Sequence, residues 1–164
     1  MTDKRARMKG RSERGKRFAL IPAEVIHCAN WAQASKPCRA LVTDIAVQFT
    51  GYNNGDLSAS ISVLRPLGWR SPGTLTALLL EARHYGLLVL TRQGGLLTGA
   101  SLYALGWKPI GACVDRHTHC CKLDDAGLAG TTPTVWRMPQ PKFQRTKRPP
   151  KRKIASTPRV AISA

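Results

Sequence analysis

Acidic residues are scarce in this chain of 164 residues, in which nine Asp and Glu stand against 26 Lys and Arg, giving a formal net charge of +17. Aromatic residues make up only 6%. No apolar run approaches the ~20 residues that a membrane-spanning helix requires, and the basic N-terminus is not followed by the apolar stretch of a signal peptide. We therefore expect a cytoplasmic protein without a membrane partner.

The motifs of several enzyme and metal-site classes are also missing. The five cysteines form no C-x-x-C pair, and their odd number in a cytosolic chain indicates reduced thiols. No G-x-x-x-x-G-K-[ST] sequence is present to bind a nucleoside triphosphate. Asp124 and Asp125 are adjacent on an expected loop, without a scaffold for Ser, His and Asp catalysis. We expect neither an enzyme nor a cofactor.

Positive charge is concentrated at the two ends. Residues 1–17 contain eight Lys and Arg and two acidic residues. Residues 18–136 contain nine Lys and Arg and seven acidic residues, and residues 137–164 contain nine Lys and Arg and no acidic residue. This distribution favours a nearly neutral folded module between basic, largely disordered arms that bind a polyanion. A solubilising tail without a specific partner is the alternative. A lipid surface is less favoured, because neither arm has the apolar face of an amphipathic helix.

The first half of the module is expected to be helical. The pattern predicts a short helix over Ala23–Trp31 and a longer one over Ser35–Phe49, with Ser35 as its N-cap. The Asn53–Gly55 segment is typical of a turn, and Leu57-Ser58 could add a short strand to a later hairpin.

Two helical patterns and a hairpin follow. A helix carrying Ile61 and Leu64 is shortened by Pro66, and a turn at Gly68–Arg70 leads to a helix capped by Ser71 that ends at Gly86. The side chains expected to face the core from this second helix are Leu75, Leu78, Leu79, Ala82 and Tyr85. Next come a strand over Leu87–Arg92, a glycine-rich loop over Gln93–Ala100 and a strand over Ser101–Trp107.

This order of elements predicts an α+β, mainly helical fold, a winged helix-turn-helix spanning residues 18–110. The recognition helix would be Ser71–Tyr85 and the wing Arg92–Ser101. Residues 111–164 are expected to form a linker and a basic, Pro-rich tail. Trp31, Trp69 and Trp107 are expected in the core.

The expected partner of this module is double-stranded DNA. The outward side of the second helix offers small residues but no Arg, Asn or Gln to grip a base edge, so phosphate contacts and shape readout are favoured. The candidate DNA-binding residues are Arg65, Arg70, Ser71, Gly73, Thr74, Thr76, Ala77, Arg92, Gln93, Lys147, Arg148, Lys151, Arg152 and Lys153.

One cluster contains metal-ligand residue types: Cys113, His117, His119, Cys120 and Cys121. Zinc needs four ligands that converge tetrahedrally, whereas adjacent cysteines point apart and His-x-His suits only an extended segment. We expect reduced thiols in a polar linker and no metal site.

Several runs resemble one group of proteins. These runs are Phe18–Pro22, Val47–Phe49, Gly51–Ser58, Leu67–Ser71, Gly86–Gly95 and Ser101–Pro109. They are similar to winged helix-turn-helix proteins carried by bacterial phages, prophages and plasmids, some of them replication or regulatory proteins. The resemblance implies that Ser71–Tyr85 is the recognition helix and that Gly94–Gly99 is the wing tip. Pro66 and the apolar recognition helix depart from the pattern.

The sequence therefore favours a DNA-binding protein of a mobile element, acting as a transcriptional regulator or replication accessory. An RNA-binding or ribosome-associated protein is the first alternative, because basic tails suit folded RNA equally. A protein-interaction adaptor that uses the apolar edge near Leu80 and Leu88 is the second. A homodimer remains an open expectation.

Overall fold

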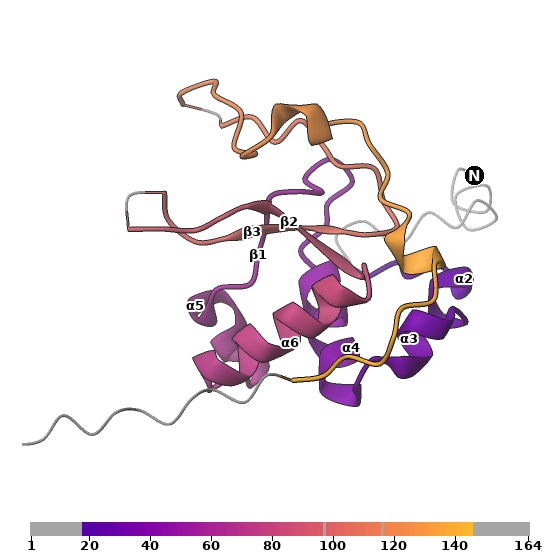
Figure 1. Cartoon of the computed structure of the whole chain (residues 1–164). Coiled ribbons are helices and arrows are strands. Elements are labelled where there is room, and N and C mark those ends of the chain that lie inside the picture. The colour runs from indigo at the N-terminus through magenta and orange to yellow at the C-terminus, as the bar shows by residue number, and fades with distance from the viewer. Residues whose placement is uncertain (1–17, 97, 116, 146–164) are drawn as a thin grey trace, which may run out of the picture.

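The computed structural model describes residues 18–96, 98–115 and 117–145. Helices cover one side of a small three-stranded antiparallel sheet, so the expected α+β class is confirmed (Figure 1). The elements are α2 (Ala23–Ile26), α3 (Ala29–Gln33), α4 (Lys36–Ala46), β1 (Leu57–Ser58), α5 (Ile61–Leu64), η1 (Arg65–Leu67), α6 (Pro72–His84), β2 (Leu88–Arg92), β3 (Leu102–Leu105), η2 (Ala126–Leu128) and η3 (Val135–Arg137). Within these residues, no helix is long and apolar enough to cross a membrane.

The N-terminal helices begin where the sequence provides caps. The Ser35 hydroxyl accepts a hydrogen bond from the Cys38 N–H at 3.3 Å, as expected for the N-cap of α4. The single helix expected over Ala23–Trp31 is instead divided into α2 and α3. Cys28 lies between them in an extended conformation, and its sulfur accepts from the Trp31 N–H and so caps α3.

Pro66 has the effect that the sequence predicts. Helix α5 lasts one turn, and the chain continues as the 3₁₀ helix η1 up to Gly68, whose φ of +94° reverses its direction. The Ser71 hydroxyl then accepts from the Thr74 N–H at 3.3 Å, and Pro72 occupies the first position of α6. Of the three tryptophans expected in the core, Trp69 is only half-buried, and its indole N–H donates to Asp44.

The strands lie in the order β1-β3-β2, with Tyr103 of β3 opposite both Leu57 and Leu90. The register shifts after Leu90, where the buried Thr91 donates its hydroxyl hydrogen to the Gly55 carbonyl at 2.6 Å. Successive side chains of β3 point to opposite faces. Those of Tyr103 and Leu105 join the helical core, and Ala104 packs with Ile110 and Leu123 on the other face.

Helix α6 is fixed against the start of α4 by a buried carboxylate. The Glu81 side chain accepts from the Ser35 backbone N–H at 2.7 Å and from the Ser35 hydroxyl at 2.9 Å. Burial of the Glu81 carboxylate is possible because Ser35 donates a hydrogen bond to each of its oxygens.

The chain after Ile110 differs most from the expected linker and tail. Residues 111–130 cover the face of the sheet opposite the helices, and residues 131–145, called the strap below, return along α3 and α6 (Figure 1). Trp136 of the strap is only 4% exposed and joins the helical core. The physical reason is that one large apolar side chain stabilises the docked segment without any periodic pattern. Residues 146–164 lie outside the described residues.

Candidate nucleic-acid interface

The N-terminal end of α6 is open to solvent and has cationic residues beside it. Ser71, Gly73 and Thr74 are exposed, as is Arg70, which immediately precedes the N-cap. Arg65 is exposed in η1, within the turn that leads to α6. The first N–H groups of a helix favour anions. The fold therefore brings the free helix end and two of the candidate arginines into one short segment.

Further along α6, the exposed side carries small or apolar residues and one cation. Thr76 is exposed, but its hydroxyl donates to the Pro72 carbonyl at 3.0 Å. Leu80 is 46% exposed, and Arg83, one turn after Leu80, is exposed too. Ala77 is only half-buried. A surface of this kind permits close approach but offers little base-specific hydrogen bonding.

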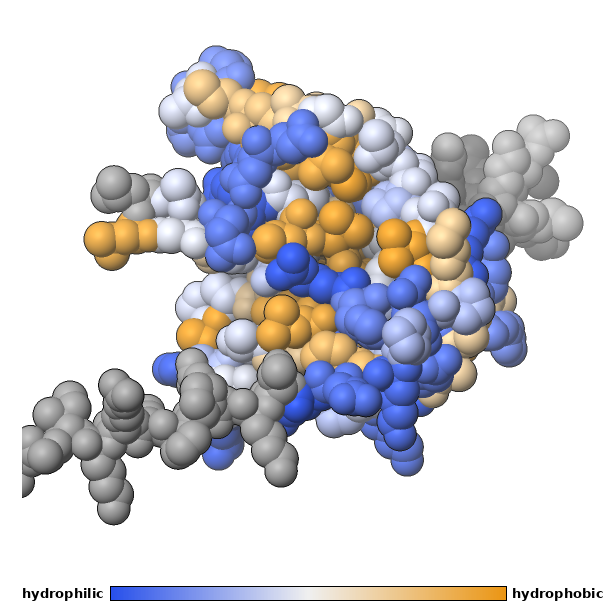
Figure 2. Space-filling view, in the orientation of Figure 1, coloured by the Kyte–Doolittle hydropathy of each residue, from blue (hydrophilic) through white to orange (hydrophobic). Residues whose placement is uncertain are grey.

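The β2–β3 hairpin stands out from the body of the molecule (Figures 1 and 2). Its base is held by Arg92, whose guanidinium donates to the Ala100 carbonyl at 3.1 Å. The Arg92 Nε is buried without a hydrogen-bond partner among the described residues. Gly95 and Gly99 exchange backbone hydrogen bonds of 3.0 and 3.1 Å beneath the tip, where Leu96 is fully exposed. Gln93 is exposed at the start of the loop.

A hollow of about 430 Å³ lies between α6 and the hairpin. Its walls are formed by Ala59, Ser60, Thr76, Leu79, Leu80, Arg83, Gln93, Ala100, Ser101 and Tyr103. The Tyr103 hydroxyl is neutral, as for any tyrosine at neutral pH, and burial raises its pKa further. The hollow therefore offers neutral polar groups and one exposed guanidinium, that of Arg83.

A second hollow, of about 380 Å³, lies between α6 and the strap. Thr74 and Ala77 line it from α6, and Lys142, Phe143 and Arg145 line it from the strap. The sequence predicts Lys142 and Arg145 only as part of a basic tail. No local signal places them beside α6, because the contacts that dock the strap involve residues more than 50 positions away.

No protein-family model, curated protein or solved structure matches this chain. Of the candidate DNA-binding residues, Arg65, Arg70, Ser71, Gly73, Thr74, Thr76, Ala77, Arg92 and Gln93 are described, and they extend from η1 along α6 to the hairpin. Lys147, Arg148, Lys151, Arg152 and Lys153 lie outside the described residues.

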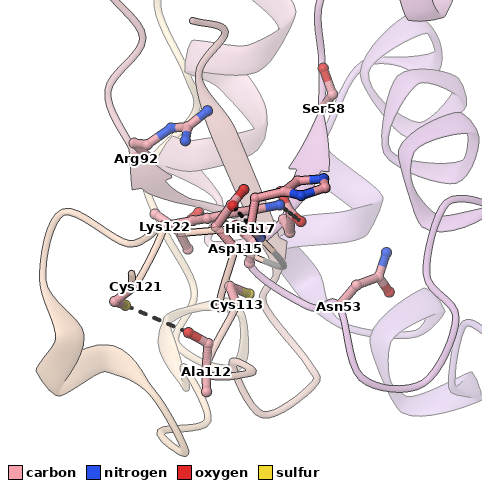
Figure 3. A network of polar contacts seen from close by, with 12 residues as sticks. Asn53, Ser58, Arg92, Ala112, Cys113, Asp115, His117, Cys121 and Lys122 are labelled. Atoms are coloured by element: carbon pink, nitrogen blue, oxygen red, sulfur yellow. Dashed lines mark hydrogen bonds and ion pairs between the residues drawn. The ribbon is translucent and has the colours of Figure 1, made fainter. Parts of the chain in front are cut away.

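The cluster of metal-ligand residue types lies elsewhere, on the loop over residues 111–122 (Figure 3). The Asp115 carboxylate accepts from the backbone N–H groups of Thr118 and His117, which lower its pKa. Lys122 forms an ion pair with Asp56 at 2.8 Å. Over the described residues, no group of three or more His, Cys, Asp or Glu is placed to hold a metal ion. His119, with φ of +54°, and Cys120 are both exposed.

The thiols should differ strongly in reactivity. Burial, followed by the nearby Glu81 carboxylate, raises the pKa of Cys38 to about 12, and burial also raises that of Cys113 to about 11. Only the thiolate reacts with iodoacetamide, and its fraction at pH 8 falls as the pKa rises. We expect exposed Cys120 and Cys121 to be alkylated first and Cys38 only after unfolding. Mass spectrometry of peptides from a time course measures the order, and early labelling of Cys38 would contradict the packing of α4 on α6.

Proposed function

We propose that this chain is a winged helix-turn-helix protein that binds double-stranded DNA. Helix α5 with η1, the turn at Gly68 and α6 would form the helix-turn-helix, and the β2–β3 hairpin would form the wing. The short strand β1 pairs with β3 and so ties the segment before α5 to the base of the hairpin. The observation that best supports the proposal is the open start of α6, with Arg65 and Arg70 next to it.

In this arrangement the first turns of α6 enter the major groove. Gly73 and Thr74 allow the helix to approach closely, while Arg65 and Arg70 meet phosphates on either side. The hairpin reaches the neighbouring backbone through Gln93. Because the first turns of α6 carry no Arg, Asn or Gln that could form bidentate hydrogen bonds with a base edge, affinity comes mainly from phosphate contacts and from DNA shape. A transcriptional regulator or a replication accessory of a mobile element would both use such a surface.

Replacing both arginines tests the proposal. We expect the R65Q/R70Q double variant to bind a duplex about 10-fold more weakly near 0.15 M salt, because two phosphate contacts are lost. Fluorescence anisotropy over a series of salt concentrations measures the affinity and the slope of log affinity against log salt. If each arginine neutralises one phosphate, the magnitude of this slope should be smaller by about 1.8 in the double variant. The matched control is K108Q/R137Q, which loses the same charge. Lys108 lies over the Phe49 ring and Arg137 over the Trp136 ring.

The nature of the nucleic acid is tested with the unaltered chain. Labelled duplex DNA and a structured RNA of equal length are compared at matched salt. Tighter binding to the duplex, together with a loss in R65Q/R70Q that exceeds the loss in the control, supports the proposal. Preference for the RNA, an equal loss in both variants, or no binding to either nucleic acid would overturn it.

A further inference from the structure

The strap is anchored by one fully buried side chain. Asn30 of α3 is 0% exposed, and its Nδ2 donates to the backbone carbonyls of Met138 at 2.8 Å and Trp136 at 3.1 Å. Its Oδ1 accepts from the Gln140 N–H at 2.8 Å. An amide whose nitrogen and oxygen both pair with the backbone, from η3 to Gln140, fixes the position of that segment.

Beyond Gln140 the strap runs along α6 in the opposite direction. The Pro141 carbonyl lies 2.7 Å from Nε2 of His84, and the Phe143 N–H donates to the Tyr85 hydroxyl at 3.0 Å. Arg145 then lines the hollow opposite Thr74 and Ala77, nearer the start of α6. Helix α6 thus lies between the hairpin on one side and the strap on the other (Figure 1).

The strap is cationic towards that hollow. Residues 131–145 contain no acidic residue, and two of their three cations, Lys142 and Arg145, line the hollow. The third, Arg137, lies over the Trp136 ring and does not line the hollow. Lys142 and Arg145 are exposed, whereas the Glu81 carboxylate, which also lines the hollow, is buried and accepts two hydrogen bonds from Ser35. Two exposed cations therefore lie beside α6.

We propose that the strap forms the second flank of the nucleic-acid surface, on the side of α6 opposite the hairpin, with Lys142 and Arg145 as phosphate-contacting residues. This inference rests on the proposed function. It adds that the strap contacts the phosphate backbone of the same DNA duplex whose groove α6 occupies. Because Asn30, His84 and Tyr85 hold the strap in place before binding, its cations meet phosphate without first being ordered. In this respect they differ from cations on a free chain.

The double variant K142Q/R145Q in the full chain tests the flank. We expect about 10-fold weaker binding to a duplex near 0.15 M salt and a slope of log affinity against log salt reduced by about 1.8. K108Q/R137Q again serves as the charge-matched control. A loss no larger than that of the control would overturn the inference.

The anchor is tested separately from the charges. Tyr85→Phe removes only the hydroxyl that accepts from Phe143, and Asn30→Ala removes the central anchor. If docking positions the cations, each anchor variant should weaken binding in the wild-type background and have little further effect in K142Q/R145Q. Fully additive losses would overturn the positioning role. Tyr85→Phe keeps the test decisive if Asn30→Ala fails to fold.

The outcomes separate this inference from the proposed function. A wild-type chain that binds duplex DNA, with a loss in R65Q/R70Q but none beyond the control in K142Q/R145Q, overturns the strap flank alone. A wild-type chain that does not bind duplex DNA, or that prefers structured RNA, overturns both. If R65Q/R70Q and K142Q/R145Q each lose more affinity for the duplex than the control variant, the proposed function and the strap flank are both supported.

Discussion

Replacing Trp136 with alanine is expected to lower the free energy of unfolding by about 3–5 kcal/mol. Trp136 is 4% exposed and packs in the helical core, so the replacement removes a large buried surface and leaves a cavity. It also loosens the segment whose carbonyls accept from Asn30, which would leave a buried amide short of partners. Urea unfolding followed by circular dichroism measures the change.

Met138→Ala provides the matched control. Met138 lies two residues further along the strap, but its side chain is 62% exposed, so the replacement should cost well under 1 kcal/mol. The comparison distinguishes a strap that belongs to the folded unit from a tail that merely follows it. If Trp136→Ala were as mild as Met138→Ala, the docking of residues 131–145 would be wrong.

The parts of the fold that depend on neighbouring residues could be predicted from the sequence. Ser35 and Ser71 cap α4 and α6, because an N-cap is decided within three residues. Pro66 shortens α5 for the same local reason. The hairpin follows from two aliphatic runs separated by glycines.

The parts that depend on distant partners could not be predicted. Nothing in the sequence distinguishes Asn30 from other polar residues. Its anchoring role depends on backbone carbonyls that lie more than 100 positions later in the chain. Trp136 stands alone in a segment without a hydrophobic period, which is typical of a linker. The sequence pattern therefore assigns Lys142 and Arg145 to a basic tail. For the candidate site, the arginines near α6 could be chosen from the sequence, whereas the flank formed by the strap could not.

The largest effect on binding is expected from the basic ends of the chain. Residues 1–17 contain eight Lys/Arg and residues 146–164 six, more than half of the 26 in the whole chain. We expect a variant that lacks both segments to bind duplex DNA at least about 100-fold more weakly near 0.15 M salt, because each phosphate no longer neutralised removes about 0.9 from the slope of log affinity against log salt. The shortened chain retains the strap and Trp136, so its fold should be unchanged, which circular dichroism verifies.

A second variant separates charge from chain length. In the full-length chain, every Lys and Arg of the two end segments is replaced by glutamine, which removes the charge and keeps the number of residues. If counterion release drives the contribution of the arms, this variant should match the shortened chain in both affinity and salt slope. Full affinity and a full slope in both variants would show that the arms take no part, and binding would then depend on Arg65, Arg70, the hairpin and the strap. A loss in the shortened chain without a loss in the glutamine variant would instead assign the contribution of the arms to contacts other than charge.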